Sequence, residues 1–212
     1  MSKRLIDILA ATAILVVLSP VYLMIALSVC LAMGWPPLFT QMRAGLKGQL
    51  FPIYKFRTMT RVVDTVGKPL PDDIRLTALG RFLRRTSLDE LPEFINVLKG
   101  EMSLVGPRPL LPEYLPHYTA EQARRHDVRP GITGLAQISG RNDLGWDERF
   151  EIDVWYVDHA SLLLDLKIMA HTVRIVLRGK GVSAPGHATM PRFDDERRVR
   201  SDTEAAPPPN TI

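Results

Sequence analysis

Residues 5–33 read LIDILAATAILVVLSPVYLMIALSVCLAM, and Asp7 is the only charged residue among them. A straight helix of this length would run about 43 Å, whereas the hydrocarbon core of a bilayer is about 30 Å thick. Ser19 and Pro20 lie near the middle of the stretch. Proline removes a backbone donor and clashes with the preceding turn, and the serine can bond a freed carbonyl. We therefore expect a sharp bend at Ser19 and Pro20.

Basic residues flank the apolar stretch on both sides, with Lys3 and Arg4 before it and Arg43 and Lys47 after it. Positive residues favour the cytoplasmic side of a membrane, so both ends are expected there and the helix is expected to be re-entrant. Hydropathy alone fits a tilted, kinked transmembrane helix about as well. A cleaved signal peptide is disfavoured because the stretch is long and lacks a small-residue cleavage site. Asp7 is interpreted as an interfacial residue.

Charge and motif content narrow the classes of function. The formal net charge is +4 and the sequence pI about 9.4, which suits an anionic partner such as a phospholipid or a phosphorylated substrate. The single cysteine, Cys30, excludes an intrachain disulfide framework and agrees with a reducing cytoplasm. Neither a GxxxxGK[ST] loop nor a GxGxxG motif is present, so the sequence indicates neither a P-loop ATPase nor a dinucleotide enzyme.

The rest of the chain predicts mainly helices with a small β element, an α+β fold. A short hairpin is expected within 38–59, a loop over 62–73, and an extended or looped proline-rich segment over 103–116. Helices are expected over 76–85, 88–99, 146–157 and 162–178. The 76–85 helix is basic and amphipathic, which suits either a membrane surface or an ordinary solvated face.

This organisation predicts three parts. Residues 1–37 would form the re-entrant membrane anchor, and residues 38–183 a compact cytoplasmic catalytic domain with amphipathic interfacial helices. Residues 184–212 are charged and then proline-rich, which predicts a disordered tail without a part in the chemistry.

The stretch SLDELP, residues 87–92, carries the most information about chemistry. A purely structural explanation is available, because Ser87 and Glu90 have the spacing of a helix capping box. The arginines on either side of the stretch argue against this explanation, because they carry more positive charge than two carboxylates need. They are Arg81, Arg84 and Arg85 just before the stretch, and Arg108, Arg129 and Arg141 on later glycine- and proline-rich loops.

Arginines on stiff loops suit bidentate recognition of phosphate groups. Of two adjacent carboxylates, one can attack phosphorus while the other holds a magnesium ion that neutralises phosphate charge. Mg²⁺ is usually held by one or two carboxylates together with substrate phosphates, so a dense acidic cage is not required. The pair Asp89 and Glu90 therefore becomes the candidate catalytic centre.

Asp153 is the second notable acid. It interrupts an apolar helical stripe formed by Trp146, Phe150 and Val157, and acids are rarely buried unless they are paired or functional. A structural salt bridge, for instance to Arg141, and a direct role in the site remain equal alternatives.

Six motifs in this order resemble those of the bacterial sugar transferases, the monotopic phosphoglycosyl transferases, over residues 3 to 181. They are Lys3-Arg4 through Ser19-Pro20, KFRTM (55–59), TSLDELP (86–92), SLVGPRP (103–109), RPGITG (129–134), and GRN (140–142) with Asp153 and Trp155-Tyr156. The resemblance implies that Ser19-Pro20 breaks a re-entrant helix, that Asp89 is the nucleophile and that Glu90 is the Mg²⁺ ligand. It also implies that Lys55, Arg108, Arg141 and Asp153 line the active site, with Arg108 on a phosphate; Arg85 and Arg129 are further substrate-binding candidates.

The expected activity is transfer of a phosphosugar from a UDP-sugar to polyprenol (undecaprenyl) phosphate through a covalent Asp89 intermediate, releasing UMP. The expected location is the bacterial inner membrane, with the catalytic domain on its cytoplasmic face and a role in the first membrane step of glycoconjugate or polysaccharide synthesis. The sequence allows a homodimer but does not decide the oligomeric state. The alternatives are a membrane phosphatase that uses water as acceptor, and a non-catalytic membrane-surface adaptor that recruits glycosyltransferases. Nucleic acid is the least favoured partner, because the basic residues are dispersed and no recognition motif is present.

Overall fold

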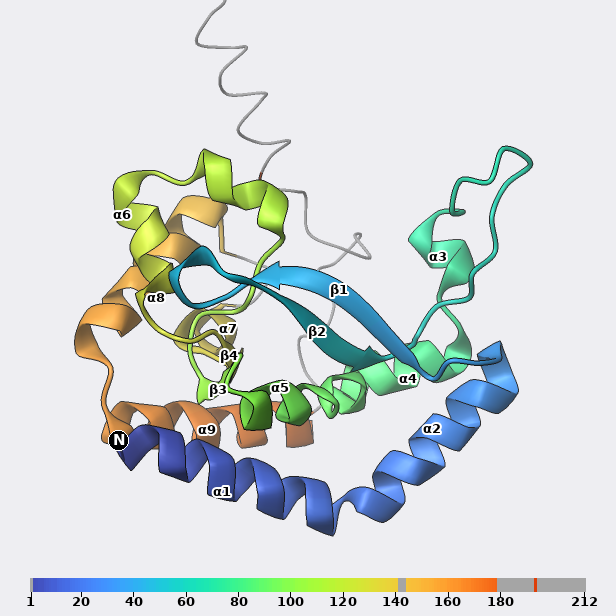
Figure 1. The fold of residues 1–212 in the computed structure, drawn as a ribbon, viewed down its shortest axis with the longest axis horizontal. Coiled ribbons are helices and arrows are strands. Elements are labelled where there is room, and N and C mark those ends of the chain that lie inside the picture. Colours follow the sequence, from blue (N-terminus) through green and yellow to red (C-terminus); the bar gives the residue numbers. More distant parts are fainter. Residues whose placement is uncertain (1, 141–143, 179–192, 194–212) are drawn as a thin grey trace, which may run out of the picture.

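Two helices that meet at a sharp bend form the N-terminal part of the chain in the computed structural model, which describes residues 2–140, 144–178 and 193 (Figure 1). Helices α1 (Ser2–Val17) and α2 (Ser19–Met33) are inclined to each other by 64°. Ser19 Oγ donates to the carbonyl of Val16 at 2.8 Å, and Pro20 lies in the first turn of α2. The bend predicted at Ser19 and Pro20 is confirmed.

By length and hydropathy, no single helix within the described ranges could cross a membrane. The bent pair α1 and α2 meets those criteria only when the two helices are taken together.

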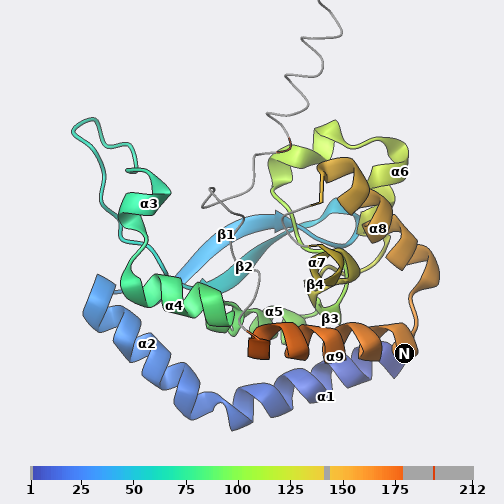
Figure 2. The ribbon, with the colours of Figure 1, turned by 180° about the vertical axis from the view of Figure 1, so that it is seen from behind.

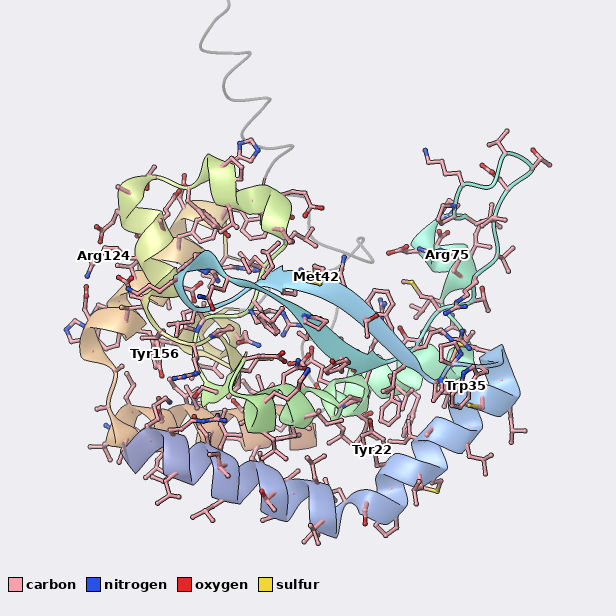
Figure 3. The ribbon with its side chains drawn as sticks, in the orientation of Figure 1. Tyr22, Trp35, Met42, Arg75, Arg124 and Tyr156 are labelled. Atoms are coloured by element: carbon pink, nitrogen blue, oxygen red, sulfur yellow. The ribbon has the colours of Figure 1, made fainter. Side chains whose placement is uncertain are left out.

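An antiparallel hairpin follows the bent pair, as predicted. Strands β1 (Leu38–Ala44) and β2 (Leu50–Phe56) pair with Leu38 opposite Phe56, and the 3₁₀ turn η1 (Leu46–Gly48) joins them. Phe51 and Ile53 of β2 enter the main core. Tyr22 points from α2 toward the end of β2, where its ring lies 4.7 Å from that of Phe56 (Figure 3). The hairpin therefore packs against both the core and helix α2.

The segment from 72 to 100 confirms the helix predicted over 76–85 to within two residues, but a 3₁₀ turn and a shorter helix stand where a single helix was predicted over 88–99. Helices α3 (Asp72–Arg75) and α4 (Ala78–Thr86) are followed by the 3₁₀ turn η2 (Leu88–Glu90) and by α5 (Glu93–Lys99). Ser87 has a left-handed backbone (φ 56°), ends α4, and makes no side-chain cap bond to η2. The capping-box explanation of Ser87 and Glu90 is therefore wrong, because the Ser87 side chain makes no cap bond and only the short 3₁₀ turn η2 follows it.

A short parallel pair was not predicted. Within the proline-rich segment, β3 (Ser103–Val105) pairs with β4 (Gly131–Thr133). The two chains come so close that a Cβ on Gly131 would lie 2.1 Å from the backbone nitrogen of Gly106. The glycine is thus required by packing at this crossing.

Six further elements complete the described part of the chain. They are η3 (Pro112–His117), α6 (Ala120–Ala123), η4 (Arg124–Asp127), α7 (Leu135–Ser139), α8 (Trp146–His159) and α9 (Leu162–Arg178). The last two confirm the predicted helices at 146–157 and 162–178. The predicted tail lies outside the described residues except for Phe193, whose ring is buried among Tyr114, Tyr118 and Phe150.

Helix α1 lies alongside α9 and under β3 (Figures 1 and 2). Lys3 is hydrogen-bonded to Asp165 of α9 and, at 3.2 Å, to the carbonyl of Val105. Asp7 is buried, with 4% of its surface exposed, and accepts a hydrogen bond from the Leu104 N–H at 3.2 Å. The interpretation of Asp7 as an interfacial residue is corrected, because its carboxylate joins α1 to β3 in the interior.

Large apolar side chains are exposed mainly on the bent pair and on α9, and those of α1 and α2 point away from the body of the molecule (Figure 3). They include Leu5, Ile8, Leu9, Val16, Val17, Leu23, Met24, Leu27 and Leu31 on the pair, and Leu162, Leu163, Leu166 and Val173 on α9. An apolar surface of this extent is typical of a protein that contacts a membrane or a partner.

Gly80 allows α4 to pack directly against the backbone of Thr58, because an added Cβ would lie 1.9 Å from the carbonyl oxygen of Thr58. We predict that Gly80→Ala lowers the free energy of unfolding by about 1–3 kcal/mol, because a backbone carbonyl cannot move aside cheaply. Gly145→Ala is the matched control, since nothing lies within 4 Å of its added Cβ. Thermal melting of the detergent-solubilised proteins checks this, and equal melting of both variants would contradict it.

Candidate active site

Three segments far apart in the sequence bring charged side chains to one place. The turn η2 carries Asp89 and Glu90, strand β2 carries Lys55, and the loop after β3 carries Arg108. The Lys55 ammonium and the Arg108 guanidinium each donate to Oε1 of Glu90 at 2.6 Å. The structure thus brings together four of the residues predicted from the sequence.

Glu93 is a fifth member that sequence reasoning missed. Glu93 is the first residue of α5, and its side chain is 2% exposed. Its Oε1 lies 3.0 Å from the Lys55 ammonium. This is an ion-pair distance, although that oxygen accepts no hydrogen bond from the described residues. The signal that could have found it is its spacing, one helical turn after Glu90.

The surrounding charges and burial shift the pKa values of the three carboxylates in different directions. Burial alone would raise the pKa of Glu90, but Arg108 and Lys55 outweigh it and hold that pKa far below its usual value. Burial, together with the charge of Glu90, raises the pKa of Asp89, and burial raises the pKa of Glu93 to about 7 against the opposing charge of Lys55. Glu90 therefore carries the firmly ionised charge, and Asp89 is the poorly solvated carboxylate beside it.

Both cations stay charged within the cluster. Burial would lower the pKa of Lys55, but the neighbouring Glu90 and Glu93 raise it above its usual value. The charge of Glu90 likewise raises the pKa of Arg108. A site that keeps two such cations is suited to phosphate groups, which accept charge-assisted hydrogen bonds.

The other predicted site residues are placed less centrally. Arg84, and not Arg85, lies close enough for its charge to oppose the rise in the pKa of Asp89. Arg84 Nε donates to Thr58 Oγ1 at 3.1 Å, while Arg85 is exposed. Arg129 is also exposed and donates from Nε to the carbonyl of Gly100 at 2.8 Å. Arg141 lies outside the described residues.

Asp153 is buried on α8 and is paired with Arg125, which donates to its Oδ2 from Nη2 at 2.7 Å and from Nε at 3.1 Å. The salt-bridge alternative is therefore realised, with Arg125 where Arg141 had been suggested. The same Nη2 donates to the carbonyl oxygen of Arg108 at 2.8 Å. Sequence reasoning missed Arg125 because its partners lie 17 and 28 residues away in the chain.

The carboxylates fit a magnesium ion that is held jointly with a substrate. Among the described residues, no three His, Cys, Asp or Glu side chains are grouped as a complete metal site. Mg²⁺ does not require such a group, since one or two carboxylates and the phosphates of a bound substrate suffice. Glu90 and Asp89 offer the oxygen ligands that this ion prefers.

Adjacent carboxylates, of which Asp89 is buried, lie with a lysine and arginines in an α+β domain on a bent apolar helix pair, an arrangement that suits the class of enzyme that acts on phosphorylated substrates. The comparisons agree with this class. Residues 1–179 match the family described as bacterial sugar transferase, so the chain belongs to that family.

Three relatives show how far the similarity extends. The chain is 53% identical to the uncharacterized sugar transferase EpsL of Bacillus subtilis, over 94% of this chain and 98% of that protein. It is 41% identical to the undecaprenyl-phosphate galactose phosphotransferase of Salmonella typhimurium, over 84% of this chain and 41% of that protein. It is 44% identical to the UDP-glucose:undecaprenyl-phosphate glucose-1-phosphate transferase of Klebsiella pneumoniae, over 81% and 39% respectively. The chain thus spans about two-fifths of the length of the last two proteins.

His126, next to Arg125 on η4, is a buried histidine whose proton uptake differs between the folded and unfolded chain. Its Nδ1 donates to the carbonyl of Gly45 at 3.0 Å, and its buried Nε2 finds no partner among the described residues. Burial, and then the charge of Arg125, lowers the pKa of His126 from 6.5 to about 4. The unfolded chain therefore takes up this proton at a higher pH than the folded protein does.

We predict that the contribution of His126 to stability falls by up to about 3 kcal/mol as the pH drops from 6.5 to 4. Glu93, whose pKa is raised, contributes with the opposite sign, so the effect of His126 is measured as a difference between variants. His126→Asn keeps a donor toward Gly45 and removes the titrating group, so its melting temperature should fall less over that range. The exposed His171→Asn is the control. Parallel curves of melting temperature against pH for the wild type and His126→Asn would contradict the assignment.

Proposed function

We propose that this protein transfers a sugar phosphate from a UDP-sugar to polyprenol phosphate, with Asp89 as the nucleophile. The observation that carries the proposal is the buried carboxylate of Asp89, which lies beside Glu90 and close to the positive charges of Lys55, Arg84 and Arg108. The names of the Salmonella and Klebsiella relatives support the choice of donor and acceptor, since they specify sugar phosphate transfer to undecaprenyl phosphate.

The reaction consists of two displacements at one phosphorus atom. In the first, an oxygen of the Asp89 carboxylate attacks the sugar-proximal phosphorus, the bond from that phosphorus to the bridging oxygen breaks, and UMP leaves. In the second, a phosphate oxygen of the polyprenol phosphate attacks the same phosphorus. The aspartyl–phosphorus bond breaks, Asp89 is regenerated, and polyprenyl diphosphate-sugar is the product.

The surrounding charges favour both steps. Arg108 and Lys55 are placed to donate to phosphate oxygens as negative charge develops there, and preorganised charges of this kind usually supply most of the rate enhancement in phosphoryl transfer. Asp89 is poorly hydrated, so little solvent has to be removed from it before it attacks. Glu90 would hold Mg²⁺, which supplies further neutralisation of the phosphate charge when it is bound.

The bent helix pair would place this site at a membrane. The exposed apolar surface of α1 and α2 and the basic residues at both ends of the pair favour a re-entrant anchor, with both ends on the cytoplasmic side. The acceptor is a lipid and the donor is soluble, so a catalytic domain held at the cytoplasmic face of the inner membrane can reach both.

Asp89→Asn is predicted to lower the rate of UMP release by roughly a thousandfold or more, because an amide oxygen is a poor nucleophile. The melting temperature should stay within a few degrees of that of the wild type. Asp64→Asn, in the loop between β2 and α3, is the matched control and should release UMP at the wild-type rate. UMP release at the wild-type rate by folded Asp89→Asn would contradict the proposed nucleophile.

Glu90→Gln and removal of Mg²⁺ with a chelator are each predicted to reduce formation of the lipid-linked product by at least about a hundredfold. The assay incubates a series of UDP-sugars with undecaprenyl phosphate and follows both UMP and the lipid product. UMP without any lipid product would favour a phosphatase. Absence of turnover with every donor, and indifference to Mg²⁺ and to Glu90→Gln, would favour an adaptor.

A further inference from the structure

Arg125 is a buried arginine to which neither the proposed reaction nor the motifs assign a role. Its side chain is 2% exposed. Two of its nitrogens donate to Asp153, and one of them also donates to the backbone carbonyl of Arg108. A single side chain therefore connects α8, η4 and the loop that carries the phosphate-binding candidate.

The surroundings hold the Arg125 guanidinium in one orientation. It lies 5.9 Å from the ring centre of Tyr118 and 5.6 Å from that of Phe150. Asp153 receives both donated hydrogen bonds on the same oxygen, and its side chain is 4% exposed. Replacing a buried ion pair with apolar side chains is often neutral or stabilising, so stability alone is a weak reason for this pair. Its geometry offers a more specific one.

The loop after β3 is held residue by residue up to Arg108. Gly106 N–H donates to the carbonyl of Thr133 at 2.9 Å, and the carbonyl of Pro107 accepts from Gly131 N–H at 3.0 Å. These two contacts come from β4, and the next carbonyl, that of Arg108, is held by Arg125. The Arg108 side chain leaves the same residue and reaches Glu90 at 2.6 Å.

We propose that Arg125, anchored by Asp153, is a positioning residue that fixes the backbone of Arg108 and so aims its guanidinium at the phosphate of the donor. The role in donor binding rests on the proposed function. Arg125 acts through Arg108 and does not itself touch the substrate. A displacement of about 1 Å at a phosphate-binding group is enough to cost up to about a hundredfold in activity.

The first test does not depend on activity. Hydrogen–deuterium exchange is measured for the segment 103–111 in the full-length protein, for wild type, Arg125→Lys, Asp153→Asn and the control Arg124→Lys. Arg124 is adjacent, lies at the outer surface, and pairs with Glu121 and Asp158 (Figure 3). Faster exchange in this segment for Arg125→Lys and Asp153→Asn, but not for Arg124→Lys, is expected. Unchanged exchange in both variants would overturn the proposal, even if the protein had no transferase activity.

The second test is a double-mutant cycle on UMP release. Arg125→Lys is expected to raise the KM for the UDP-sugar between about ten- and a hundredfold with a smaller change in kcat. In an Arg108→Ala background the same substitution should change KM by less than about twofold, because the group that it positions is gone. Independent, multiplicative effects would overturn a role through Arg108. If Arg125→Lys does not fold, Asp153→Asn replaces it in the cycle. A wild-type protein that releases no UMP would instead count against the proposed function.

Discussion

One oxygen atom, Oε1 of Glu90, holds the candidate site together, because Lys55 of β2 and Arg108 of the loop after β3 both donate to it at 2.6 Å. The side chains of Lys55 and Glu90 are each only 18% exposed, so they lose much of their hydration, and removing either partner would leave the other with a poorly compensated charge. The hairpin, the turn at Ser87 and the β3–β4 crossing each deliver one group to this point. The fold is thus a means of bringing short, irregular segments to a common centre of charge.

The same segments are tied to the two ends of the bent helix pair. At its start, Asp7 accepts from Leu104 on β3, four residues before Arg108. At its end, Arg57 donates to the carbonyls of Met33 and Gly34 and lies two residues after Lys55. These buried contacts fix the pair relative to the residues that surround Glu90. If the pair enters the bilayer as proposed, the height of the carboxylates above the lipid is set by the fold, which suits an enzyme with one soluble and one membrane-bound substrate.

The elements that depend on neighbouring residues in the sequence could be predicted from it. The bend at Ser19 and Pro20, the hairpin and the helices α8 and α9 follow from proline sterics and hydrophobic periodicity, and the grouping of Lys55, Asp89, Glu90 and Arg108 came from a resemblance of motifs. What was missed depends on contacts between distant residues. The parallel pairing of β3 with β4, the burial of Asp7 and the Arg125–Asp153 pair each join positions at least 28 residues apart. The capping box failed for a different reason, since Ser87 takes a left-handed backbone that the S-x-x-E spacing does not reveal.

The central proposal is that the Asp89 carboxylate becomes covalently joined to phosphorus. Its most direct test is mass spectrometry of the protein mixed with UDP-sugar and Mg²⁺ and quenched before any polyprenol phosphate is added. The account predicts an increase in intact mass equal to one sugar phosphate, located by peptide mapping at Asp89 and lost when the lipid acceptor is supplied. Sustained UMP release with an unmodified protein, or an adduct on another side chain, would contradict it.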